Sequence, residues 1–224
     1  MFQDTLDALR HLLWPSRCAS CDLLLDAPNA HLCEECRVGV RFAGERPAPE
    51  ALDSAFSFFY YEGAIQSMIT RWKYHEDYAA RLALLACMGE KIMDAAHQFD
   101  VPVAVVPVPP HPRRLRERGF DPVWTLASKL SSQLSTALNA EVKLVDECLH
   151  RSRHTVHQAG LSAEDRAQNL IDAFSTEGPV PERILLVDDV MTTGATMTAC
   201  ALALRAAGAQ YVAAMSLACT SKQD

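Results

Sequence analysis

Residues 183–197 read RILLVDDVMTTGATM, and this stretch decides the fold. Its apolar start predicts a buried strand, which ends at two aspartates, Asp188 and Asp189. Residues 194–208, GATMTACALALRAAG, then have the spacing of a helix that is closed by a glycine. Ligands of α/β sheets bind at the carboxyl ends of the strands, so the turn between this strand and this helix is the first candidate site.

Strand and helix patterns alternate through the rest of the chain. We expect further strands at 54–63, 101–110, 141–149 and 210–219. We expect two helices within 64–96, with a break near His75 to Asp77, and one helix at 120–140. Polar residues without periodicity predict a loop at 150–163. This alternation predicts an α/β fold in which a mainly parallel sheet is covered by helices on both faces.

Composition and charge narrow the class of protein. The chain has 224 residues, of which 49% are hydrophobic and 22% charged, the balance of a soluble globular protein. The net charge of −7 argues against a surface coated in basic residues for duplex DNA. No apolar run is long enough to cross a membrane, and the N-terminal segment lacks the basic start of a secretory signal. We therefore expect a cytoplasmic protein without membrane insertion, of unknown oligomeric state.

Four of the eight cysteines have the spacing of a metal site. Cys18 and Cys21 form one C-x-x-C turn, and Cys33 and Cys36 form a second after eleven intervening residues. Two such turns can direct four sulfurs to one point, as a structural zinc ion requires. A pair of disulfides and four buried cysteines are the alternatives, and a reducing cytoplasm disfavours the disulfides. The segment is too short to bury a core, so the metal would supply its folding energy.

These patterns predict three parts of the chain. Residues 1–40 would form an N-terminal helix and the zinc-binding module. Residues 41–52, which contain two prolines and several charges, would be a linker. Residues 53–224 would form the domain that contains the sheet, with the other four cysteines in its core.

The turn after the two aspartates has the chemistry of a phosphate site. Backbone N–H groups at a helix N-terminus favour an anion, Gly194 allows a close approach, and the threonine hydroxyls can donate to phosphate oxygens. Carboxylates repel a phosphate, so the aspartates suit a diol or a metal ion instead. A ribose 5-phosphate offers both features. The Walker A and dinucleotide-binding motifs are absent, and the alternative is a capped helix with solvated aspartates.

The motifs resemble those of a known family. VDDVMTTGATM is similar to the 5-phosphoribosyl 1-pyrophosphate (PRPP) motif of type I phosphoribosyltransferases. Three further segments resemble the ComF family of competence proteins: KYHEDYAARLA at 73–83, PVPPHPRRLRERGFDPVWTLA at 107–127 and RSRHTVHQAGLSAEDRAQNLIDAF at 151–174. With the four-cysteine module, the resemblance covers nearly the whole chain. It implies the type I phosphoribosyltransferase fold next to a small zinc-binding module.

The resemblance also implies roles for particular residues. Asp188 and Asp189 would be the catalytic pair that holds the ribose hydroxyls. The full PRPP-binding set would be Asp188, Asp189, Val190, Met191, Thr192, Thr193, Gly194, Ala195 and Thr196. Pyrophosphate would contact Lys73, Val108, Pro109, Pro110, Arg113 and Arg114. A flexible hood would contain Arg151, Arg153, His157 and Gln158. Thr192 stands where several purine-specific members have an acid, which argues against a purine acceptor.

The basic residues leave alternatives open. The arginines of 113–118 can form an anion site for pyrophosphate, a solvated basic face, or a track for single-stranded nucleic acid. In the last case Trp72, Phe120 or Trp124 would stack on bases. Lys73 can pair with pyrophosphate or extend along the surface into solvent.

The expected function is a PRPP-dependent phosphoribosyl transfer. A nucleophile that the sequence does not identify would displace pyrophosphate from C1 of PRPP, with magnesium bound to the diol and the pyrophosphate. The ComF resemblance implies a role in DNA uptake, natural transformation or DNA utilisation, with single-stranded DNA and the DNA-uptake machinery as partners. The alternative is a non-catalytic protein that handles single-stranded DNA and keeps the PRPP site as a sensor or a relic.

Overall fold

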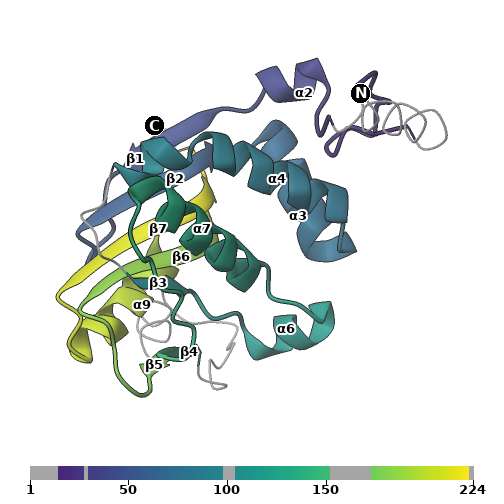
Figure 1. Cartoon of the computed structure of the whole chain (residues 1–224). Coiled ribbons are helices and arrows are strands. Elements are labelled where there is room, and N and C mark those ends of the chain that lie inside the picture. Colours follow the sequence, from purple (N-terminus) through teal and green to yellow (C-terminus); the bar gives the residue numbers. More distant parts are fainter. Residues whose placement is uncertain (1–14, 28–29, 98–103, 152–172, 222–224) are drawn as a thin grey trace.

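A five-stranded sheet forms the centre of the protein (Figure 1). The computed structural model describes residues 15–27, 30–97, 104–151 and 173–221. The strands lie in the order β1 (Phe42–Arg46), β2 (Ser54–Tyr60), β7 (Tyr211–Cys219), β6 (Arg183–Met191) and β3 (Ala104–Pro107). Only β1 is antiparallel to its neighbour; β2, β7, β6 and β3 pair in parallel. The predicted α/β fold with a mainly parallel sheet is confirmed.

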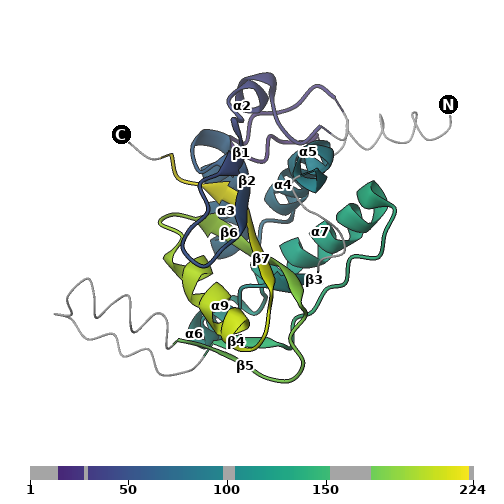
Figure 2. The ribbon, with the colours of Figure 1, turned by 90° about the vertical axis from the view of Figure 1, so that its left-hand side faces the viewer.

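Helices cover both faces of this sheet (Figure 2). One face packs against α3 (Gly63–His75), α4 (Tyr78–Glu90), α5 (Ile92–Ala96) and α7 (Pro122–Leu138). The other face packs against α9 (Ala195–Ala206) and a two-stranded sheet of β4 (Leu149–Arg151) and β5 (Phe174–Thr176). Two short helices lie away from the sheet, α2 (Glu34–Val38) and α6 (Pro112–Arg118).

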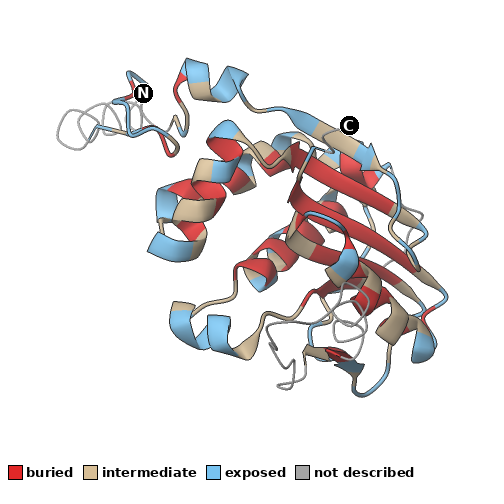
Figure 3. Cartoon of the chain, turned by 180° about the vertical axis from the view of Figure 1, so that it is seen from behind, coloured by how far each residue is buried: buried red, intermediate tan, exposed pale blue. Residues whose placement is uncertain are grey.

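Strand β6 shows why its sequence is a continuous apolar run. Leu185 and Val187 belong to the core beneath α3, α4 and α7, whereas Ile184 and Leu186 belong to the core beneath α9. Successive side chains of a strand point to opposite faces, so a strand that is covered on both sides must be apolar at every position. Figure 3 shows the central strands mostly buried: residues 184–187 and Met191 in β6, and residues 212–219 in β7.

The predicted break in the segment 64–96 is confirmed. Glu76 ends α3 in the left-handed conformation, with φ of 50°, and its N–H donates to the Arg71 carbonyl. Asp77 then begins α4, where its carboxylate accepts from the Ala80 N–H at 3.0 Å. The end of α3 is therefore held in a tight turn, and this turn lies beside the candidate site described below.

The continuous strand expected at 141–149 is not formed. Leu144 makes an isolated parallel bridge with Val105, and only the last residue, Leu149, belongs to a strand, β4. The backbone of Val142 pairs instead with α7: its N–H donates to Ser135 Oγ at 3.0 Å, and its carbonyl accepts from Ser131 Oγ at 2.6 Å. The residues that follow face β3: the Val105 N–H donates to the Lys143 carbonyl at 2.7 Å, and the Val145 N–H donates to the Val105 carbonyl at 2.8 Å. The alternating pattern buries Val142 against the helices without forming a ladder.

The stretch 41–52, expected to be a linker, contains β1. Its register with β2 pairs Phe42 with Phe59 and Arg46 with Ala55. The charged residues and the glycine of this strand concealed it, because an edge strand is exposed and carries a polar pattern. The loop expected at 150–163 begins with the end of β4, and its remaining residues lie outside the described part of the chain, as does the helix expected near the N-terminus. None of the described helices is long and apolar enough to cross a membrane.

Candidate functional site

Asp188 and Asp189 lie near the carboxyl end of β6, on the edge where the sheet meets the turn into α9. Asp189 Oδ2 forms an ion pair with Lys73 Nζ of α3 at 2.7 Å, and both side chains are about 15% exposed (14% and 15%). Asp188 Oδ1 accepts the Asp189 N–H at 2.8 Å. The two aspartates therefore lie in a partly enclosed place, and the Asp189 carboxylate is already paired with the Lys73 ammonium group.

The two aspartates lie in different electrostatic surroundings. Burial, together with repulsion from the Asp189 charge, raises the pKa of Asp188 to about 8. Lys73 and Arg151 oppose this shift without cancelling it. The Asp188 carboxyl therefore keeps its proton to a higher pH than an ordinary aspartate does.

The turn after β6 is open to solvent on its threonine side. Thr192 and Thr193 are exposed, and Thr196 is half-buried at the start of α9. Gly194 is the N-cap of α9 and has no side chain that could cap the helix; the Ala195 N–H donates to Thr193 Oγ1 at 3.4 Å. This is an arrangement that can hold an anion.

Gly194 has structural reasons to be glycine. Its φ of 80° is left-handed, and a Cβ there would lie 2.5 Å from Pro49 Cγ and 2.9 Å from Pro49 Cβ. Pro49 belongs to the connection between β1 and β2, so this connection packs against the turn that follows β6. The sequence predicted only the close approach of a phosphate at this position, and it could not predict the contact with Pro49.

Cationic side chains gather beside the ion pair. Lys73, Arg114 and Arg118 line a cavity of about 220 Å³ together with Tyr74, Glu76, Glu117 and Phe120. The structure thus brings together Lys73 and Arg114, which are 41 positions apart, from the set predicted for pyrophosphate. Arg113 does not line this cavity; it is exposed and pairs with Glu117 at 2.7 Å.

The predicted pyrophosphate loop follows β3 at the same edge of the sheet. The Val108 N–H donates to the Val187 carbonyl at 2.8 Å, so Val108 lies beside the residue that precedes Asp188. Val108 is buried, and Pro109 and Pro110 are half-buried. The loop between β3 and α6 therefore runs from the aspartates to the arginines of α6.

Two further charged residues border the aspartates. Asp121 is the N-cap of α7, and burial, with Asp189 among the smaller causes, raises its pKa. The sequence signal was the D-P-V start of a helix, which indicates a cap but not a neighbour of Asp189. Arg151, predicted in the hood, lies in β4: burial lowers its pKa, and Arg114 and Asp188 are among its charged neighbours. Arg153, His157 and Gln158 lie outside the described residues.

The four predicted metal ligands form one cluster. The sulfurs of Cys18, Cys21, Cys33 and Cys36 all lie within 4.8 Å of one another, and Cys21 and Cys33 are 3.8 Å apart. Tetrahedral Zn–S bonds of about 2.3 Å imply sulfurs about 3.8 Å apart, so the cluster fits a single ion. Burial alone would raise the pKa of Cys18, but backbone hydrogen bonds, from Cys33 foremost, lower it to about 6, whereas burial raises the pKa of Cys36 to about 12. The cluster can hold a metal such as zinc.

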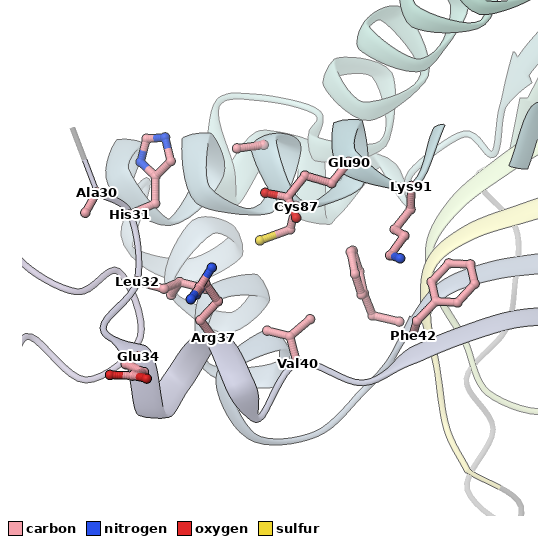
Figure 4. Close-up of a pocket in the computed structure, with 12 residues that line it drawn as sticks. Ala30, His31, Leu32, Glu34, Arg37, Val40, Phe42, Cys87, Glu90 and Lys91 are labelled. Carbon is pink, nitrogen blue, oxygen red and sulfur yellow. The ribbon is translucent and has the colours of Figure 1, made fainter. Parts of the chain in front are cut away.

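A larger cavity lies elsewhere, between the cysteine module, β1 and α4 (Figure 4). Its volume is about 620 Å³, and its lining includes Leu32, Arg37, Phe42, Cys87 and Lys91. It contains none of the predicted site residues. Size alone does not make it the functional site, because the convergent carboxylates, cations and helix N-terminus all lie at the carboxyl edge of the sheet.

The chain is similar to curated proteins that are named for competence or DNA use. It is 35% identical over 168 residues to competence protein F of Haemophilus influenzae, an alignment that covers 71% of this chain and 69% of the relative. It is 24% identical over 217 residues to competence protein ComFC of Streptococcus pneumoniae, covering 87% and 90%. It is 37% identical over 115 residues to the DNA utilization protein YhgH of Escherichia coli, covering 51% and 48%. No family model matches the chain.

Proposed function

The chain belongs to the ComF family of competence proteins, and from that premise we propose that it binds PRPP at the edge of its sheet and acts in the uptake or use of DNA. The observation that carries the proposal is one constellation. A carboxylate pair, an open threonine turn at a helix N-terminus and a cationic cavity meet beside the Lys73–Asp189 ion pair. Each part matches one part of PRPP: a diol, a 5-phosphate and a pyrophosphate.

Each group of PRPP has a partner in this constellation. The ribose hydroxyls would donate to the carboxylates of Asp188 and Asp189. The 5-phosphate would accept from the N–H groups of residues 192–196 and from the threonine hydroxyls. The pyrophosphate would lie against Lys73 and Arg114, whose charges support it as a leaving group. The transfer to an acceptor would then depend on the positioning of C1 and on this electrostatic support.

Magnesium fits this proposal only as a partner of the ligand. The cysteine cluster is the only group of three or more close metal-ligating side chains in the described ranges, so the aspartates alone offer no complete cation site. Magnesium keeps several waters and prefers phosphate oxygens, so it would arrive with the pyrophosphate. When bound, it would neutralise charge on the pyrophosphate; Asp188 and Asp189 would accept hydrogen bonds from its waters.

The cysteine module is proposed to hold one structural zinc ion. Its three-residue core of Cys18, Leu25 and Cys33 is too small to stabilise a fold alone. A closed four-sulfur site leaves no position for a substrate, so the metal would act on folding and not on chemistry.

A second candidate function is binding of single-stranded DNA. Arg113 and Arg116 are exposed on α6, and Trp124 is 44% exposed at the start of α7. Arginines that contact phosphates and an aromatic face that stacks on bases are the elements of such a site. Trp72, considered for stacking from the sequence, is 2% exposed in the core and cannot take that role.

Isothermal titration of the full chain with PRPP and magnesium tests the main proposal. We expect a single saturable site, and competition by pyrophosphate. Release of pyrophosphate during incubation with candidate acceptors would identify an enzyme. Binding without release would favour the sensor, and the absence of binding at millimolar PRPP would overturn the PRPP site.

A further inference from the structure

The cysteine module contacts the sheet domain along one face of α3. Ala19, in the first C-x-x-C turn, is 2% exposed and belongs to the main core. Ser67 Oγ of α3 donates to the Ser20 carbonyl at 3.0 Å. One turn further along α3, the two terminal nitrogens of Arg71 donate to the two oxygens of Asp22, both at 3.0 Å. Residues four apart on a helix share a face, so these contacts form one interface.

Arg71 joins this interface to the turn that follows α3. Its Nε donates to Asp77 Oδ2 at 2.7 Å, and its backbone carbonyl accepts the N–H of Glu76. Asp77 in turn caps α4. One guanidinium therefore holds both a residue of the cysteine module and the residue that begins the next helix.

The same turn reaches the candidate site on its other side. Lys73 pairs with Asp189, and Lys73, Tyr74 and Glu76 line the small cationic cavity. Lys73 follows Arg71 by two positions in the same last turns of α3. A shift of this turn by a fraction of an ångström would therefore change both the Lys73–Asp189 distance and the shape of the cavity.

The module has a looser contact on its other side. Figure 4 shows the 620 Å³ cavity between Arg37 and Val40 of the module side and Cys87 of α4. Close packing is interrupted there, so the α3 interface is the tighter mechanical connection between module and sheet domain.

We infer that Arg71 is a positioning residue that couples the folded cysteine module, through Asp22, to Lys73 and so to anion affinity at the sheet edge. The inference rests on the proposed function, because it assigns regulation to the same site. It would connect a metal-binding module that contributes no residue to the cavity with the occupancy of that cavity.

Asp22→Asn in the full chain is the first test. Asp22 has φ of 63°, a conformation that asparagine tolerates, and its side chain is 60% exposed, so the fold and the metal content should persist. Affinity for magnesium pyrophosphate should fall about three- to tenfold, the range of a modest coupling. Glu62→Gln is the matched control: it removes the Arg41–Glu62 ion pair, of 2.9 Å, at the opposite end of α3, and affinity should stay within about twofold.

A double-mutant cycle with Lys73→Gln separates positioning from general destabilisation. If Asp22 acts through Lys73, Asp22→Asn should cause no further loss of affinity in the Lys73→Gln background. Equal losses in both backgrounds, or no loss in the wild-type background, would overturn the coupling.

Hydrogen exchange keeps the coupling testable if the wild type binds neither PRPP nor pyrophosphate, the result that would overturn the proposed function. Amides of residues 71–80 should exchange faster in Asp22→Asn than in wild type, and at the wild-type rate in Glu62→Gln. Equal exchange in all three proteins would overturn the inference independently of any ligand.

Discussion

Lys73 Nζ lies 2.7 Å from Asp189 Oδ2, and this ion pair connects the end of α3 to the end of β6. Both side chains are mostly buried, so water screens their mutual attraction less than it would on the surface. A ligand with hydroxyls and an anionic group would compete with this ion pair, because its hydroxyls would donate to Asp189 and its anionic group would attract Lys73. In the structure, each of these two charges is neutralised by the other.

Asp189→Asn should weaken PRPP binding about ten- to hundredfold, because a hydrogen bond to a charged group contributes about 1.5–3 kcal/mol. Titration calorimetry with magnesium measures the change. Asp94→Asn, which removes an exposed carboxylate 3.8 Å from Lys91, is the control and should bind as wild type does. Equal affinities of wild type and Asp189→Asn would assign the carboxylates to another ligand.

Asp188→Asn should flatten the dependence of stability on pH. The folded pKa of Asp188, about 8, lies above the unfolded value of about 3.9. Its contribution to stability is therefore complete below pH 4 and is lost as pH rises through 8. In thermal unfolding, the wild type should lose stability relative to Asp188→Asn as pH rises from about 4 to about 8. Parallel profiles would contradict the raised pKa.

Cys36→Ser should abolish metal binding and unfold the module while the sheet remains folded, because the metal supplies the module's folding energy. Metal analysis of protein purified under reducing conditions should find one zinc ion per chain in wild type and none in the variant. Cys87→Ser, which changes a half-buried cysteine outside the cluster, should keep the metal. A wild-type protein without metal would refute the zinc site.

Gly194→Ala should lower the free energy of unfolding by about 1–3 kcal/mol, because alanine resists the left-handed conformation and its Cβ would clash with Pro49. Pro49→Ala removes Cγ, the nearer of the two clashing atoms, and should rescue part of the loss in the double variant. Chemical denaturation measures all three variants. Additive losses would mean that the Pro49 contact is not the cause.

Arg116→Gln and Arg114→Gln should separate the two candidate functions. Both arginines are exposed on α6, but only Arg114 lines the cavity beside Lys73. Arg116→Gln should weaken binding of single-stranded DNA and reduce its salt dependence by about one counterion, with PRPP affinity unchanged. Arg114→Gln should weaken both. Fluorescence anisotropy with a labelled oligonucleotide at low salt gives the DNA affinity, and a wild type that does not bind would exclude a direct DNA role.

The local sequence pattern was sufficient to predict those elements whose structure depends on residues a few positions apart. The strand, aspartates, turn and helix of 183–208 lie as predicted, because apolar runs, turn residues and helix spacing act within a few positions. The C-x-x-C turns likewise specify their own sulfur geometry. The pattern at 141–149 did not give a continuous strand, because Val142 bonds to serines of α7 and only Lys143 and Val145 bond to β3.

Contacts between distant segments needed the tertiary structure. The sequence indicated that Lys73 and Arg114 are cationic, but only the tertiary placement of α3 and α6 brings them to one cavity. The same holds for Pro49 against Gly194 and for Asp22 on Arg71. The sequence by itself determined which groups have the chemistry to bind an anion, a diol and a metal, because side-chain type and turn conformation depend on residues that are close in the sequence. Which of these groups meet was decided by the order of strands in the sheet and by helix packing, because both depend on burial of apolar surface across the whole chain.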